Sequence, residues 1–308
     1  MTTNSEEVKK LVRERYGAKA RGVIELSEAL ATETGSETGQ DSNTEACCEP
    51  GCCGGAHNES TQVAEKLETQ GIIQLVNVSA QSCDGPGCCG PEDLDRALKL
   101  YQEGQIAGLP AESIAASAGC GNPTALAGLK PGERVLDLGS GGGIDCFLAA
   151  QQVGETGHVT GLDMTPDMLE LARKNQANLG LTNVEFIQGE LEKMPIPDAS
   201  VDVIISNCVV CLSPDKDAVF SESYRVLAPG GRIHLSDMMS LTPDGPTQID
   251  PEAWAACIAG AEDREVYLGR LRKAGFVDLE ITEEQVKFDE SEGVPLNVAS
   301  VKVVATKR

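Results

Sequence analysis

Aromatic residues are scarce in this sequence, at 3% of 308 residues. Single strands of nucleic acid bind proteins largely by stacking on aromatic rings, so this scarcity argues against such a platform. Positive charge is also in short supply, because 25 Lys and Arg face 48 Asp and Glu, for a net charge of −23. A field of this sign repels phosphate backbones and anionic lipid surfaces, which excludes nucleic acid and membrane surfaces as expected partners.

Long apolar runs are missing as well. No uncharged apolar stretch is long enough for a membrane-spanning helix. The first ten residues carry Glu6, Glu7, Lys9 and Lys10 in place of the apolar segment of a secretory signal, which predicts a cytoplasmic protein. Histidine is represented only three times, while cysteine occurs twelve times. Cysteines in a reducing compartment stay as thiols, so they indicate ligands or redox groups, and any site for a soft ion must be built mainly from sulfur.

Residues 1–92 differ in composition from the rest and are expected to form an N-terminal extension. Val8, Leu11 and Val12 have helical spacing, which predicts one short amphipathic helix. Residues 32–60 are rich in Thr, Ser, Gly, Glu and Asn, so a mobile loop is expected there. Residues 72–78 predict a strand. The extension holds two groups of cysteines. The first is Cys47, Cys48, Cys52 and Cys53, and the second is Cys83, Cys88 and Cys89.

Residues 93–240 are predicted to form an α/β core with a Rossmann-like fold. Helices are expected over 92–119, with a short one reaching residue 129. Predicted strands at 133–138, 158–163, 183–188, 201–207 and 231–237 then alternate with helices at about 144–153, 166–180 and 215–227. This alternation indicates right-handed βαβ units and a parallel sheet covered on both faces. Residues 241–308 predict helices at about 251–260 and 262–274 and two last strands, 277–283 and 298–306.

A glycine-rich turn follows the first strand of this core. It reads Asp137-Leu-Gly139-Ser140-Gly141-Gly142-Gly143, and the isoleucine at position 144 breaks the dinucleotide-binding pattern. A carboxylate at Asp137 suits a cationic cofactor better than a pyrophosphate, and S-adenosylmethionine carries a sulfonium and an ammonium. Asp163 follows about twenty residues later, where an acid can bind ribose hydroxyls. Alternatively, Asp137 only caps a loop and Asp163 only starts a helix.

The predicted cofactor site takes in the ends of four strands. Its candidate residues are Asp137, Gly139, Ser140, Gly141, Gly143, Asp163, Met164, Gly189, Glu190 and Asn207. Together these motifs resemble the class I S-adenosylmethionine-dependent methyltransferases over about residues 125–308. The resemblance implies a mainly parallel seven-stranded sheet with helices on both faces, here with the cysteine-bearing extension added.

Three cysteines are expected to reach the mouth of that cofactor site. Cys208 follows the fourth strand, Cys120 precedes the first, and Cys257 lies on a helix after the fifth. The strings Cys120-Gly-Asn-Pro-Thr-Ala-Leu-Ala, Ser206-Asn-Cys208-Val and Cys257-Ile-Ala-Gly-Ala resemble the arsenite methyltransferases. In that family the matching cysteines bind trivalent arsenic, and paired N-terminal cysteines add a further ligand, for which Cys47 and Cys48 are the candidates. Cys211 stands where the family more often has asparagine.

The resemblance implies methyl transfer from S-adenosylmethionine to thiolate-bound arsenite in arsenic detoxification, with thioredoxin or glutathione as thiol reductant. Trivalent arsenic attacks with its own lone pair, so no general base is needed, in keeping with the few histidines. Arsenite can engage three thiols and methylated arsenic two, which we expect to be Cys208 and Cys257. Two alternatives stay open: an O- or C-methyltransferase of a small organic molecule, and a thiol-rich metalloid-binding protein without turnover. The outlying cysteines could deliver arsenic, bind a metal such as zinc, or lack a defined role.

Overall fold

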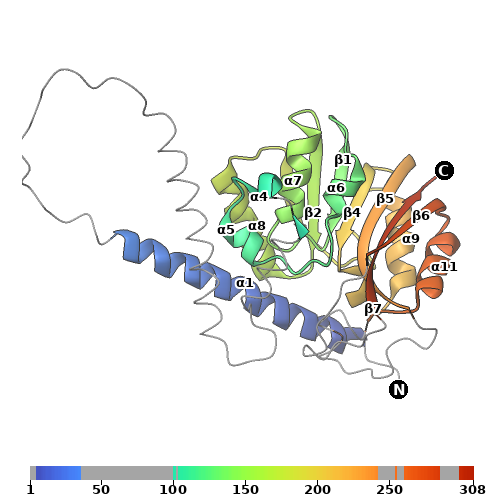
Figure 1. Cartoon of the computed structure of the whole chain (residues 1–308), viewed down its shortest axis with the longest axis horizontal. Helices are drawn as coiled ribbons and strands as arrows, with labels where there is room; N and C mark the ends of the chain where they lie inside the picture. Colours follow the sequence, from blue (N-terminus) through green and yellow to red (C-terminus); the bar gives the residue numbers. More distant parts are fainter. Residues whose placement is uncertain (1–4, 36–99, 102, 242–253, 255–259, 285–297) are drawn as a thin grey trace, which may run out of the picture.

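A seven-stranded sheet forms the centre of the protein in the computed structural model, which describes residues 5–35, 100–101, 103–241, 254, 260–284 and 298–308. The strand order is β3-β2-β1-β4-β5-β7-β6 (Figure 1). The strands are β1 (Arg134–Leu138), β2 (His158–Asp163), β3 (Val184–Gln188), β4 (Val201–Asn207), β5 (Leu227–Ser240), β6 (Val277–Glu284) and β7 (Val298–Thr306). β7 is antiparallel to β5 and β6, and the other pairs are parallel. The predicted fold class is therefore confirmed.

Helices cover both faces of the sheet, as the alternation of elements predicted. The pleat turns successive side chains to opposite faces. Val135 of β1 packs with residues of α7 (Ile144–Val153) and α8 (Pro166–Leu179), whereas its neighbour Leu136 packs with α9 (Lys216–Val226) and α11 (Arg264–Ala274). Strands buried on both faces explain why their sequences are almost continuously apolar.

The chain reverses direction across the sheet between β1 and β4. From β1 it runs outward through β2 to β3, and from β4 it runs the other way to β5. Ligands of open α/β sheets bind beyond the carboxyl ends of the strands at such a reversal. The glycine-rich turn follows β1 and Cys208 follows β4, so the fold brings both to this point.

The N-terminal helix corrects the sequence analysis, which predicted only a short helix there. α1 runs from Ser5 to Gly35, because the apolar stripe continues through small residues that a search for large side chains passes over. Val8, Val12, Ala20 and Val23 are all buried along it. Figure 1 shows α1 as a long helix along one edge of the domain, where it packs on α5 (Ala111–Ala115) and α8.

Other element boundaries also differ from the prediction. The helical stretch expected over 92–119 is described only as α4 (Glu103–Ile106) and α5, followed by α6 (Pro123–Ala127). β5 is longer than the predicted 231–237. The predicted strand at 72–78, both N-terminal cysteine groups and almost all of the helix expected at 251–260 lie outside the described residues. None of the described helices has the length and apolar character that crossing a membrane requires.

Candidate active site

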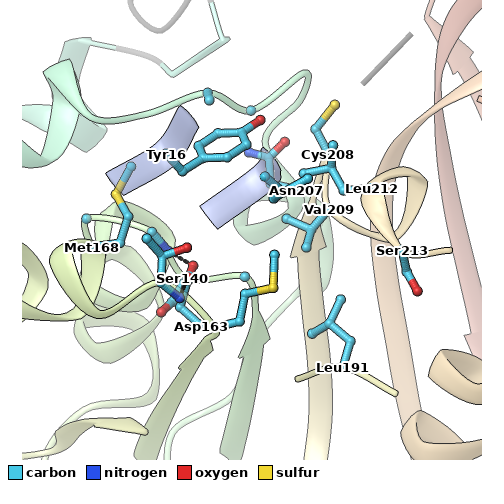
Figure 2. A pocket seen from close by; sticks show the side chains of 18 of the residues that line it. Tyr16, Ser140, Asp163, Met168, Leu191, Asn207, Cys208, Val209, Leu212 and Ser213 are labelled. Atoms are coloured by element: carbon cyan, nitrogen blue, oxygen red, sulfur yellow. Dashed lines mark hydrogen bonds between the residues drawn. The ribbon is translucent and has the colours of Figure 1, made fainter. Parts of the chain in front are cut away.

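A cavity opens at the carboxyl ends of β1, β2 and β4, at the reversal of strand order. Its wall includes the glycine-rich turn, the residues after β2, the end of β4 and one face of α1. Figure 2 shows Ser140, Asp163 and Met168 on one side of the cavity and Cys208, Val209 and Leu212 on the other. Predicted site residues that line it are Gly139, Ser140, Gly141, Asp163, Met164, Gly189, Asn207 and Cys208.

The glycine-rich turn needs glycine for shape as well as for space. Gly139 and Gly141 have φ values of +69° and +50°, which residues with a side chain rarely adopt. A Cβ atom at Gly139 would lie 2.5 Å from the side chain of Val209. The bare backbone therefore lets the segment after β4 approach the turn and leaves the cavity between them open.

Asp163 fixes the glycine-rich turn from the end of β2. One carboxylate oxygen accepts a hydrogen bond from the Gly141 N–H at 2.9 Å, and the other accepts one from the Thr165 N–H at 2.8 Å. Burial raises the pKa of Asp163, and these backbone donors oppose the rise. Asp163 therefore both shapes the turn and presents oxygen atoms to the cavity, as a ribose-binding carboxylate would.

Asp137 lies behind the cavity wall and is not among the residues that line it. Its carboxylate accepts a hydrogen bond from the Cys146 thiol at 3.2 Å. Burial, followed by the charge of Asp145, raises its pKa well above the ordinary value, which favours the neutral acid. Gly143 and Glu190 are also missing from the wall, while Asp145, which the sequence analysis overlooked, belongs to it.

Asp145, in the first turn of α7, is a second buried carboxylate that lines the cavity. It accepts hydrogen bonds from the Tyr101 hydroxyl and from the Asn207 side-chain amide, each at 3.1 Å. Burial raises its pKa to about 6, against the lowering effect of those donors. At neutral pH Asp145 is therefore largely ionised and places a negative charge at the cavity.

Asn207, the last residue of β4, ties the cysteine loop to the sheet. Its side-chain oxygen accepts hydrogen bonds from the backbone N–H groups of Cys120 at 3.0 Å and Gly121 at 3.1 Å. Its amide nitrogen donates to the Gly121 carbonyl at 2.7 Å. The Ser300 hydroxyl on β7 holds the same loop by donating to the Cys120 carbonyl at 2.9 Å. Cys120 is thus positioned by two strands that lie far from it in the sequence.

Cys120 and Cys208 share one apolar cluster next to the cavity. Both are buried, and the cluster also contains Cys211, Leu212 and Met238, with Trp254 packed against it. The four cysteines that the structure describes, namely Cys120, Cys146, Cys208 and Cys211, are thiols and not disulfides. Cys257 and the pair Cys47 and Cys48 lie outside the described residues.

α1 supplies a part of the site that the sequence analysis missed. Lys9, Val12 and Tyr16 line the cavity from this helix. Lys9 pairs with Glu190 at 2.8 Å and with Glu192 at 3.3 Å. Burial alone would lower the pKa of Lys9, but the hydrogen bond to Glu190 and the charge of Glu192 outweigh it, so the pKa is raised. Glu190, which the sequence predicts to bind cofactor, belongs to this ion-pair cluster.

Known proteins resemble the chain over this region. The family model of a methyltransferase domain matches residues 129–287. The arsenic(III) S-adenosylmethionine methyltransferase from Chlamydomonas reinhardtii superposes with a TM-score of 0.56 and is 40% identical, over 66% of this chain and 71% of that one. The chain belongs to the arsenite methyltransferase family.

Curated arsenite methyltransferases agree with this membership. The one from Halobacterium salinarum is 51% identical over 173 residues, which is 55% of this chain and 44% of the relative. The human enzyme is 42% identical over 137 residues, or 41% of this chain and 36% of the relative. The chain thus spans about half or less of the length of these curated relatives.

The cavity fits S-adenosylmethionine, the methyl donor of the family. Within the described part of the chain, the Ser140 hydroxyl is buried at the cavity without a hydrogen-bond partner, so it can serve a ligand. Asp163 offers oxygen atoms for ribose, and Asp145 offers negative charge for a cationic ligand. Apolar side chains of Val12, Met168 and Leu191 complete the wall.

Proposed function

We propose that this chain transfers methyl groups from S-adenosylmethionine to trivalent arsenic held by cysteine thiolates. The observation that carries the proposal is the position of Cys208, which lines the cofactor cavity directly after β4 and shares an apolar cluster with Cys120. A soft, thiophilic atom held there lies next to the space that the methyl donor would fill.

S-adenosylmethionine supplies an electrophilic methyl group when bound. The glycine-rich turn, Ser140 and Asp163 would hold the nucleoside part, and Asp145 would favour the cationic part. The thiolates orient arsenic so that its lone pair points at the methyl carbon. Such alignment can lower a barrier by roughly 7–11 kcal/mol. Apolar residues around the thiols exclude water, which assists a step that quenches charge.

Cys120, Cys208 and Cys257 are proposed as the arsenic ligands, with Cys47 and Cys48 as further candidates. Asn207 acts as a positioning residue, because it links the end of β4 to the loop of Cys120. The arsenic lone pair would form the As–C bond as the S–CH₃ bond of the sulfonium breaks, which would release S-adenosylhomocysteine and leave arsenic formally pentavalent. Two electrons from a pair of thiols return it to the trivalent state, so a reductant such as thioredoxin or glutathione is proposed to restore the thiols. A cytoplasmic setting would supply both reductant and methyl donor.

The deciding experiment incubates the purified protein with arsenite, S-adenosylmethionine and a thiol, and then separates the arsenic species. We expect methylated arsenicals together with S-adenosylhomocysteine. Arsenite binding without these products would favour the alternative of a sequestering protein. If the protein methylates a small organic acceptor, and the Cys208→Ser variant does so at the wild-type rate, the result would favour an O- or C-methyltransferase.

A further inference from the structure

Cys208 lies beside a second thiol that the proposed function does not use. The sulfur atoms of Cys208 and Cys211 and a carboxylate oxygen of Asp237 all lie within 4.8 Å of one another, and all three residues are buried. Atoms at such separations can bind one central atom between them. The two thiols differ in setting, since Cys208 lines the cofactor cavity and Cys211 lies behind it in the same apolar cluster.

The backbone at the end of β4 creates this pairing. Cys208 has a φ of +60°, an uncommon value for a residue with a side chain, and its N–H donates to the Ser236 carbonyl at 2.7 Å. The strand thereby stops and turns into a single 3₁₀ turn, Val210–Leu212. Cys208 lies just before this turn and Cys211 lies within it, so the two thiols are three residues apart.

Asp237 holds the inner half of this turn. Its carboxylate accepts hydrogen bonds from the Cys211 N–H at 2.9 Å, from the Tyr267 hydroxyl at 3.1 Å and from the Met238 N–H at 3.0 Å. Burial, with the charge of Asp237 next, raises the pKa of Tyr267 well above its ordinary value, so that hydroxyl stays a donor. Asp237 is therefore a positioning residue that fixes where Cys211 presents its thiol.

We propose that Cys208 and Cys211 together bind trivalent arsenic that already carries one carbon substituent. This inference rests on the proposed function, since such a species is the product of a first methyl transfer and the substrate of a second. With R as the carbon group, R–As(OH)₂ exchanges both hydroxyls for two thiols: two As–S bonds form, two As–O bonds break, and two water molecules leave. Neutral reactants give neutral products, so no thiolate charge has to be created beside Asp237.

The chemistry of the pair favours this occupant. Arsenic with one carbon substituent has two exchangeable positions, and the turn offers two sulfur atoms. Structural zinc needs four ligands, whereas the described residues bring two sulfurs and one oxygen together at this turn. The structure thus offers Cys211 as the partner of Cys208, where the sequence analysis paired Cys208 with Cys257.

Phenylarsine oxide tests the pair because its arsenic also has two exchangeable positions. Trypsin cleavage after Lys193 and Lys216 leaves Cys208 and Cys211 as the two cysteines of one peptide, residues 194–216. Cys120 and Cys257 fall on separate peptides. After binding and non-reducing digestion, mass spectrometry is expected to find phenylarsenic closing a ring within peptide 194–216. Adducts joining two different peptides in its place would overturn the inference.

Variants provide an independent readout in solution. Trp254 is the sole tryptophan of the chain and packs against the thiol cluster, so its fluorescence reports binding there. Cys211→Ala is expected to weaken phenylarsine oxide binding by about 100-fold, because losing one of two linked contacts removes an effective-concentration gain of roughly 10²–10⁴. Cys146→Ala, which deletes a different buried thiol, should leave this affinity unchanged, and S-adenosylmethionine binding checks that each variant is folded.

Product analysis separates this inference from the proposed function. In Cys211→Ala, conversion of arsenite to the monomethyl species should persist while conversion to the dimethyl species is lost. Equal rates of both steps in variant and wild type would reject the dithiol but leave arsenic methylation standing. If the wild-type protein forms a phenylarsenic ring on peptide 194–216 but makes no methylated arsenic, the dithiol site stands and the proposed methyl transfer is rejected.

Discussion

The two walls of the cavity are built in different ways. The cofactor wall consists of short segments at the carboxyl ends of β1 and β2, and several hydrogen bonds from backbone N–H groups of the glycine-rich turn to Leu162 and Asp163 join them. The thiol wall is assembled from segments far apart in the chain, with Asn207 and Ser300 reaching back to the loop of Cys120. The cofactor wall therefore depends on local backbone shape, whereas the thiol wall depends on long-range contacts that single substitutions can release.

The largest difference between the walls should appear in Cys208→Ser. Serine lacks the soft sulfur that is proposed to bind arsenic, so we expect arsenic methylation to fall by on the order of 10³-fold or more, as for loss of correct positioning of a reactant. The affinity for S-adenosylmethionine, measured by calorimetry, should stay within about twofold, since that ligand uses the other wall. Loss of cofactor binding together with activity would show that the walls are not separable.

Releasing the Cys120 loop from the end of β4, within the thiol wall, should have the next largest effect. Asn207→Ala deletes the acceptor for the Cys120 and Gly121 N–H groups, and a displacement of a reacting group by about 1 Å can cost about 100-fold in rate. We expect kcat for arsenic methylation to fall by that order, with a smaller change in cofactor affinity. Asn183→Ala is the matched control, because Asn183 also donates to backbone carbonyls, but at the C-terminal end of α7 and outside the cavity wall. An equal loss of kcat in both variants would point to general destabilisation.

Acid should act on the cofactor wall through Asp145. Its pKa of about 6 means that it becomes neutral below that pH, which removes negative charge facing a cationic ligand. We expect S-adenosylmethionine binding to weaken by about tenfold between pH 7 and pH 5, and Asp145→Asn to bind weakly with a flat pH profile. Because the folded-state pKa is raised, protonation of Asp145 favours folding. Its contribution to stability is complete below pH 4 and is lost as pH rises through 6, so binding and stability should change in opposite directions.

The smallest effect should come from the ion pairs of α1. Lys9→Ala removes the contacts with Glu190 and Glu192, and partly exposed pairs contribute about 1 kcal/mol or less. We expect the Kd for S-adenosylmethionine to rise by up to about fivefold. Lys10→Ala is the control, because Lys10 pairs with Glu14 on the exposed side of the same helix. If both substitutions change the Kd equally, the ion pairs of Lys9 with Glu190 and Glu192 have no particular part in cofactor binding.

Sequence patterns predicted the sheet and the glycine-rich turn because residues close together in the sequence determine both. Apolar strands buried on both faces and the spacing from Gly139 to Asp163 need no knowledge of distant contacts. Asp137 shows what such a pattern leaves open. The motif gives its place before the turn, but not that its carboxylate is buried behind the cavity wall while Asp145 lines the cavity.

The rest of the site depends on tertiary packing that spacing does not encode. Nothing in the spacing of Lys9, Val12 and Tyr16 says that this face of α1 borders the cavity. The sequence shows Cys208 and Cys211 only as two cysteines three residues apart. The turn that brings their thiols close together depends on the positive φ of Cys208 and on the hydrogen bond from the Cys211 N–H to Asp237. The roles of Cys120, Cys208 and Cys257 stay predictions.

The hydrogen bond from Ser300 to Cys120 also constrains when the site can exist. The two residues are 180 positions apart, so during synthesis the loop of Cys120 leaves the ribosome long before the strand that fastens it. The cysteines of a growing chain would leave the ribosome one after another. The loop of Cys120 would be held in place only after β7 had inserted between β5 and β6. The arrangement that is proposed to bind arsenic would therefore form only after the sheet was complete.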